Sequence, residues 1–191
     1  MPHSDAPRPV PPYLTLLTTM VGSGLAYFAA FQLNDVLFNE LEFSQGVNWV
    51  FLPSGLRLLL VLVLGAPGAL GIVLASCVIN YQLNGYEDHL FNIVTSLISG
   101  GAPLLARTLC LDLLKMEANL EGLTAQSLLK ISAVFAAISA LLHQVWYYWT
   151  SHSANFAAGA SAMAIGEWLG TALVLATTAW TLKLIKSKRD L

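Results

Sequence analysis

Charged side chains are scarce in this sequence of 191 residues. Asp, Glu, Lys and Arg make up 10% of the chain, whereas 56% of it is hydrophobic and the mean hydropathy is +0.66. In soluble proteins roughly a quarter of the residues are charged. The net charge of −2 provides no basic surface for a run of phosphates, which excludes nucleic acid as a partner. The composition therefore predicts a protein whose main solvent is the lipid bilayer.

Cysteine and enzyme motifs are nearly missing as well. The two cysteines, Cys77 and Cys110, fall at different predicted depths and are interpreted as small apolar side chains rather than as a disulfide or a metal site. The sequence has no phosphate-binding Walker loop, no dinucleotide fingerprint, no zinc-type Cys/His spacing and no nucleophile elbow. We therefore expect no enzyme activity, no cofactor and no bound metal.

Apolar runs of the length that crosses a bilayer recur along the chain. Residues 1–12 hold five of the eight prolines and are predicted to be a disordered lead, followed by an integral membrane domain over 13–185 and a basic tail over 186–191. The expected fold class is all-α, a polytopic transmembrane helical bundle of about six spans. The six candidate spans are Leu14–Leu33, Val47–Leu64, Ala69–Leu83, Leu90–Leu109, Ile131–Trp149 and Met163–Leu182.

Two spans depart from a regular pattern. The third has only about 15 residues, or roughly 22 Å of helix, so it is left open whether it crosses fully. The fourth is interrupted by Ser99–Pro103, where two glycines and a proline predict a kink or a break. Beyond it, Leu111–Leu123 mixes charged and apolar residues and is expected to lie along the membrane interface, either as a connector or as a docking surface for a cytoplasmic partner. Thr124 is expected to cap the helix that follows.

The distribution of Lys and Arg predicts the orientation in the membrane. If the N-terminus is inside, every Lys and Arg except Arg57 falls on inner segments. The outer loops then carry acidic and His side chains but no Lys or Arg. We therefore expect both termini in the cytoplasm. The residues on inner segments are Arg8, Arg107, Lys115, Lys130, Lys183, Lys186, Lys188 and Arg189.

Arg57 is the first candidate functional residue because it lies roughly half-way along an apolar run. A charge at that depth costs on the order of 3 kcal/mol, so Arg57 should face a carboxylate, a protein interior or a wet cavity. Pro53 and Gly55 precede it and predict irregular backbone at the same depth. Two interpretations stay open: Arg57 holds two helices together, or it belongs to a ligand site.

Two further ionisable residues fall at a similar depth, in the outer half of the bilayer. Glu167 is the only acid well inside a predicted span, which makes it the natural partner of Arg57, and His143 with its neighbour Gln144 lies in the fifth span. Broken helices around charged groups form ligand sites in membrane proteins. The sequence thus predicts an outward-facing polar pocket, with Asn80 and Gln82 near its mouth. The four side chains expected to line it are Arg57, His143, Gln144 and Glu167. The alternative is a buried ion pair without a ligand.

Two short motifs resemble a known family. Trp49-Val-Phe-Leu-Pro53-Ser54-Gly55-Leu-Arg57, with Gly65 and Gly68 beyond it, resembles the opening of membrane-associated sensor (MASE-type) domains of bacterial signalling proteins. Gly166-Glu167-Trp168-Leu169-Gly170 is similar to the acidic-x-Leu-Gly motif of the last span in that family. The resemblance covers about 48–182 and implies a sensory module in the bacterial inner membrane. Phe51-Leu52 replaces an expected Trp, and the sequence has fewer spans than the usual domain.

No kinase, cyclase or phosphodiesterase follows in this sequence, so a module of this kind would relay its signal or ligand state to a membrane or cytoplasmic signalling protein. Two other functions fit the same residues. A small transporter or substrate-capturing subunit would use Arg57 and the broken spans to bind a solute. A structural assembly subunit would need Arg57 and Glu167 only for stability.

Overall fold

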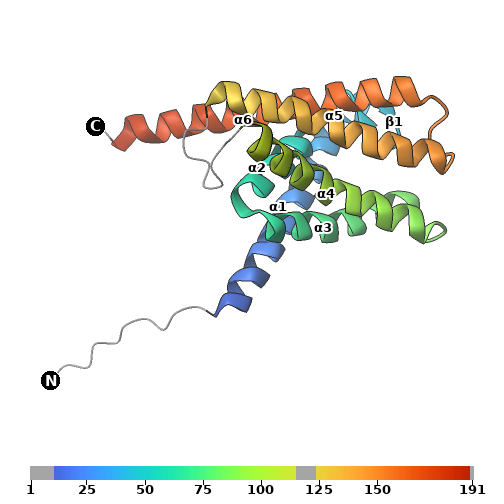
Figure 1. Cartoon of the computed structure of the whole chain (residues 1–191), viewed down its shortest axis with the longest axis horizontal. Coiled ribbons are helices and arrows are strands. Elements are labelled where there is room, and N and C mark those ends of the chain that lie inside the picture. Colours follow the sequence, from blue (N-terminus) through green and yellow to red (C-terminus); the bar gives the residue numbers. More distant parts are fainter. Residues whose placement is uncertain (1–10, 115–123, 190–191) are drawn as a thin grey trace.

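The computed structural model describes residues 11–114 and 124–189, which fold into a bundle of α-helices (Figure 1). A short two-stranded antiparallel hairpin lies between the first two helices. The predicted all-α bundle is confirmed. In chain order the elements are α1 (Pro12–Phe38), a 3-10 turn (Asn39–Leu41), β1 (Glu42–Ser44), β2 (Val47–Asn48), α2 (Leu52–Leu64), α3 (Ala66–Asn84), α4 (His89–Leu114), α5 (Ala125–Trp149) and α6 (Phe156–Arg189).

Five of these helices are long and apolar enough to cross a membrane, namely α1, α3, α4, α5 and α6. Large apolar side chains cover their outer surfaces. Leu25, Leu74 and Leu97, for example, are more than half exposed. Such side chains are stable in contact with lipid tails, whereas in water they would form an aggregating surface. The chain is therefore a multi-pass membrane protein.

Helix α2 differs from the continuous span predicted over Val47–Leu64. Val47 and Asn48 belong to the hairpin, and the helix begins only at Leu52, with Pro53 in its first turn. Its 13 residues give a length of about 20 Å, too short to cross the hydrocarbon core alone. The reason is local: a proline fits the first turn of a helix but not its interior, so Pro53 favours a helix start here.

Three other expectations are settled by the helix boundaries. The third span, predicted over Ala69–Leu83, begins at Ala66 with Pro67 in its first turn and has 19 residues. Helix α4 continues through Pro103 without the predicted break, so the fourth apolar run is one helix. Thr124 caps α5 as expected, its hydroxyl oxygen accepting a hydrogen bond of 3.1 Å from the Ser127 N–H. Residues 115–123, in the predicted interfacial helix, lie outside the described part of the chain, as do residues 1–10 of the lead.

The helices form two layers. In Figure 1, α5 and α6 run side by side above α3 and α4. Glycines bring backbones into contact within each layer. In one layer a Cβ on Gly24 would lie 2.9 Å from the Gly71 carbonyl oxygen, which joins α1 to α3. In the other a Cβ on Gly55 would lie 2.7 Å from Cβ of Val174, which joins α2 to α6. We refer to α1, α3 and α4 as the first layer and to α2, α5 and α6 as the second.

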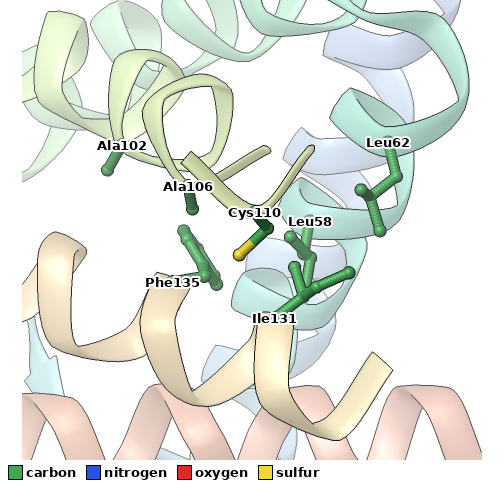
Figure 2. Close-up of a cluster of buried hydrophobic side chains, with 7 residues drawn as sticks. All are labelled: Leu58, Leu62, Ala102, Ala106, Cys110, Ile131 and Phe135. Carbon is green, nitrogen blue, oxygen red and sulfur yellow. The ribbon is translucent and has the colours of Figure 1, made fainter. Parts of the chain in front are cut away.

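The two layers meet in a dense apolar cluster between α2, α4 and α5 (Figure 2). All its members are at most 3% exposed, and no charged side chain lies among them. Close packing of this kind leaves no room for water. We call this cluster the apolar plug; it comprises Leu58, Leu62, Ala102, Ala106, Cys110, Ile131 and Phe135.

The hairpin of residues 42–48 lies at one end of the bundle, which we call the hairpin end. It is tied to α3, because the Gln45 side chain donates hydrogen bonds to the Leu83 carbonyl (3.2 Å) and to Oδ1 of Asn84 (2.9 Å). Arg107 lies towards the opposite end of α4, and Lys130 near the start of α5. That opposite end is called the basic end. Of the eight Lys and Arg residues predicted on inner segments, these two are described with their side chains, and both lie at this end.

Candidate functional site

Arg57 and Glu167 form an ion pair in the interior of the bundle. Nη2 of Arg57, on α2, lies 2.6 Å from Oε1 of Glu167, on α6, and the two side chains are 2% and 1% exposed. Either charge alone would be very unfavourable at this depth, so each requires the other. The structure therefore brings together the two residues that the sequence had paired.

The ion pair leaves hydrogen-bonding capacity unused. Nε of Arg57 and Oε2 of Glu167 have no hydrogen-bond partner among the described residues. The guanidinium carbon lies 5.5 Å from the ring centre of Phe51 and 5.3 Å from that of Phe135. These aromatic contacts stabilise the cation. Arg57 is thus held in place while part of its donor edge is not engaged.

A hydrogen-bond network extends from Glu167 into α5. The Ser139 hydroxyl donates to Oε1 of Glu167 at 2.8 Å. One turn along α5, Nδ1 of His143 lies 2.8 Å from the Ser139 carbonyl oxygen. Because a carbonyl oxygen can only accept, Nδ1 carries the hydrogen of this bond. The network therefore fixes the protonated nitrogen and the orientation of His143.

The network crosses to the first layer through the other ring nitrogen. Nε2 of His143 lies 3.3 Å from the hydroxyl oxygen of Ser99 on α4, and that hydroxyl also lies 3.0 Å from the Thr95 carbonyl oxygen. The hydroxyl of Thr95 itself is buried without a hydrogen-bond partner among the described residues. Polar side chains of four helices thus meet between the layers.

A small cavity of about 40 Å³ lies at this meeting point. Arg57, Phe51, His143 and Tyr147 belong to its walls on the side of the second layer. On the opposite side its walls include Tyr27, Ser76, Asn80, Thr95 and Ser99 from the first layer. A water molecule needs about 10–15 Å³ and two to four polar partners, so the cavity has the size and the chemistry to hold a few waters or a small polar group.

Two further cavities lie beside it under the hairpin, with volumes of about 40 and 80 Å³. All three have Gly46 and Leu83 in their walls. Polar side chains contribute to the walls of both outer cavities, beside apolar ones: Gln45, Asn84 and His152 in one, and Asn34, Asp35, Asn39, Glu42 and Asn48 in the other. A polar region thus extends from the hairpin end to Arg57, and the apolar plug lies on the other side of Arg57.

The predicted site residues occupy different positions. Arg57, His143 and Asn80 line the inner cavity, and Glu167 lies behind Arg57 without lining it. Gln144 is buried, but it packs against α6, where its Nε2 lies 3.9 Å from the Met163 sulfur. Pro53 and Gly55 are buried in the first turns of α2. Gln82 is exposed and lines none of the cavities described above, so its predicted place near the mouth is wrong.

Sequence reasoning missed Thr95, Ser99 and Ser139, which are at most 5% exposed. A weak signal for two of them is present. Asn92, Thr95, Ser96 and Ser99 recur at helical spacing in a mostly apolar run, which places them on one face of α4. Single Ser and Thr residues are common in membrane helices because their hydroxyl groups can bond to the backbone carbonyl one turn earlier. The sequence therefore does not distinguish a hydroxyl group that belongs to a polar site from one that bonds only to its own helix.

The described residues contain no group of three or more His, Cys, Asp or Glu side chains that could hold a metal ion. The polar groups of the inner cavity are hydrogen-bond donors and acceptors around one cation, which suits a small polar ligand rather than a metal. Comparisons of the chain with protein families, with curated proteins and with solved structures found no match.

Proposed function

We propose that this protein is a membrane sensory module that binds a small ligand beside Arg57 and relays its presence through α6 to a partner protein. One observation carries the proposal. Arg57 lines the cavity, whereas its ionic partner Glu167 belongs to α6. A ligand that changes the position or bonding of Arg57 acts directly on that helix, because the interior offers no other charge to which Glu167 is bonded among the described residues.

The length of α6 supports this role. Its 34 residues give about 51 Å of helix, well beyond the roughly 30 Å of a hydrocarbon core. The apolar part ends at Thr181, and the helix continues to Arg189 through a sequence that holds three lysines and one arginine. A displacement at Glu167 would therefore be carried by one continuous helix to the basic end, where a partner could detect it.

The apolar plug favours a sensor over a transporter. A transported solute would have to pass from the cavity to the basic end through Leu58, Ala106 and Phe135, which are fully buried. Alternating access requires the packing on that side to open. A sensor has no such requirement, because it transmits a conformational change past the plug and moves no solute through it. The resemblance of the Pro53–Arg57 and Gly166–Gly170 motifs to MASE-type sensor domains supports the same function.

Cysteine accessibility in proteoliposomes tests this proposal. Cys77 and Cys110 are first replaced by Ser and Ala, and single cysteines are then introduced as Asn80→Cys in the cavity wall or Ala106→Cys in the plug. We expect a membrane-impermeant thiol reagent to label the cavity cysteine from the hairpin side and the plug cysteine from neither side. Labelling of the plug cysteine from the basic side would support transport and overturn the sensor. An unreactive cavity cysteine would exclude an open ligand site.

A mild-detergent pull-down of the tagged protein from its native membrane tests the partner. We expect a kinase, cyclase or other signalling protein to be recovered with the wild type, and its recovery to change in Arg57→Ala. Gln82→Ala, at an exposed position away from the cavities, is the matched control and should behave as the wild type. Recovery of transport components alone would contradict the proposal.

A further inference from the structure

We propose that the ligand of the inner cavity is a small carboxylate and that it binds together with one proton, which is held by His143. This inference rests on the proposed function of the cavity as a ligand site. It is argued from the free edge of Arg57, from the charges around the cavity and from the hydrogen bonds of His143.

Arg57 supplies the group that recognises the carboxylate. The rings of Phe51 and Phe135 lie close to its guanidinium group, and one nitrogen bonds to Glu167. Nε retains an N–H without a hydrogen-bond partner among the described residues. N–H groups in the guanidinium plane match the geometry of a carboxylate, which binds there through charge-assisted hydrogen bonds. Because Arg57 lines the cavity, an anion that enters it meets a cation that has one donor without a partner among the described residues.

The charges around the cavity determine what must accompany the anion. Arg57 and Glu167 neutralise each other, and Tyr27 and Tyr147 are uncharged in their ordinary form. The α3 and α4 walls contribute only amide, hydroxyl and apolar groups, among them Asn80, Thr95 and Ser99. A carboxylate alone would thus give the interior a net negative charge, which is very unfavourable in a low-dielectric surrounding. One added proton restores neutrality.

His143 is the group in the cavity wall that can accept this proton. Without an anion, a protonated ring would share the cavity wall with the Arg57 cation and have no negative charge there to balance it. A bound carboxylate supplies the negative charge that stabilises the imidazolium. The titratable groups around His143 are Arg57 from α2, Glu167 from α6 through Ser139, Tyr27 from α1 and Tyr147 from its own helix; α3 and α4 contribute none to the cavity wall.

The hydrogen bonds of His143 already suit the protonated ring. Nδ1 donates to the Ser139 carbonyl. If the ring is neutral, Nε2 can only accept, and the single hydroxyl hydrogen of Ser99 must serve either Nε2 or the Thr95 carbonyl. If Nε2 is protonated, it donates to Ser99, which then donates to Thr95. The three contacts, from Nδ1 to the Ser139 carbonyl, from Nε2 to Ser99 and from Ser99 to the Thr95 carbonyl, are satisfied at the same time only in the protonated form.

Nitrogen NMR of the full chain in lipid nanodiscs, with ¹⁵N-labelled histidine, tests the inference. Acetate and propionate are the probes, and acetamide and propionamide are neutral molecules of the same shape. We expect the carboxylates to convert the His143 ring to the imidazolium form with saturation. By linkage, one proton is taken up with each anion, so their affinity should rise about tenfold for each unit by which the pH falls, in the range where free His143 is neutral and the probe is ionised. The amides should leave the ring neutral.

Two variants identify the signal. His143→Gln should lose the responding resonance, whereas His89→Gln, at an exposed histidine outside the cavity, should retain it. The wild-type comparison of carboxylate with amide decides the matter even if the first variant does not fold. Carboxylate affinity that is independent of pH, or no response of His143 to either carboxylate, would overturn the inference. The accessibility of Asn80→Cys is measured without these probes, so the test of the proposed function is independent of this test of the ligand's chemistry.

Discussion

The backbone N–H of Phe51 donates a hydrogen bond of 3.0 Å to the carbonyl oxygen of Gly166. Phe51 lies between the hairpin and α2, whereas Gly166 lies in the interior of α6 and directly precedes Glu167. One turn along α6, Gly170 packs against the carbonyl group of Phe51. The segment that links the hairpin to α2 is therefore joined to α6 next to the ion pair. A movement of the hairpin would be transmitted through this contact to Glu167.

Replacing either glycine by alanine should weaken this contact. A Cβ at Gly166 would collide with the Asn48 carbonyl oxygen, and one at Gly170 with that of Phe51, and neither backbone group can move away as a flexible side chain would. We expect Gly166→Ala and Gly170→Ala each to lower the free energy of unfolding by about 1–3 kcal/mol, the usual range for overpacking. Unfolding in bicelles, followed by circular dichroism, measures the change.

Gly101→Ala is the matched control for these variants. Gly101 also lies inside a membrane helix, but a Cβ there would meet no atom within 4 Å. Alanine is favoured over glycine in a helix by up to about 1 kcal/mol, so this variant should be as stable as the wild type or slightly more stable. Equal losses at Gly101 and Gly166 would contradict the assigned contact.

Asn34 should be required for the start of α2. Its Oδ1 accepts a hydrogen bond of 2.8 Å from the Leu52 N–H, so a residue of α1 satisfies a donor in the first turn of another helix. Asn34→Ala leaves that N–H without its partner, which should destabilise the fold by about 1–3 kcal/mol. The exposed neighbour Asn39 provides the control, because Asn39→Ala should change the stability by less than about 0.5 kcal/mol. Equal stability of the two variants would show that Asn34 does not cap α2.

The sequence was sufficient to predict the helical bundle and the pairing of Arg57 with Glu167. Both predictions follow from the same physical fact, the high energy of an unpaired charge or of an unsatisfied backbone in lipid. An apolar run must become a helix there, and an isolated cation must find an anion. Because Glu167 is the only acid well inside a predicted span, the choice of partner was nearly forced.

The details that the sequence did not reveal depend on local competition between weak effects. Val47–Leu64 is mostly apolar, so its hydropathy does not mark the hairpin at Val47 or the helix start at Leu52. Ser99–Pro103 was expected to kink or break α4, and the helix continues through it. Helices in membranes tolerate proline because neighbouring groups stabilise the backbone that it frees. Ser99 and Ser139 were missed because their roles depend on the distance to residues of other helices, and sequence spacing does not encode that distance.

The distribution of Lys and Arg predicts which side of the membrane the hairpin faces. In intact cells, an impermeant thiol reagent should label Ser44→Cys in the hairpin, and should label Lys130→Cys near the start of α5 only after the membrane is opened. Both residues are exposed, so burial does not confound the comparison. The reverse pattern would show that the cavity opens to the cytoplasm.

Breaking the ion pair from either side should be more harmful than removing it. Arg57→Ala or Glu167→Ala leaves one buried charge uncompensated, which should lower the free energy of unfolding by about 3–5 kcal/mol. Arg57→Met combined with Glu167→Leu removes both charges and should be considerably more stable than either single variant. A double variant as unstable as the sum of the two single ones would show that the side chains are not coupled.

The charge swap, Arg57→Glu with Glu167→Arg, tests most directly whether the pair serves a ligand site or only joins two helices. It keeps the ion pair but removes the cation from the α2 position that lines the cavity. We predict that the swap recovers most of the stability lost in the single variants and fails to recover the signalling partner as the wild type does in the pull-down. Recovery of both stability and partner binding would contradict the ligand site and identify Arg57 and Glu167 as a purely structural pair.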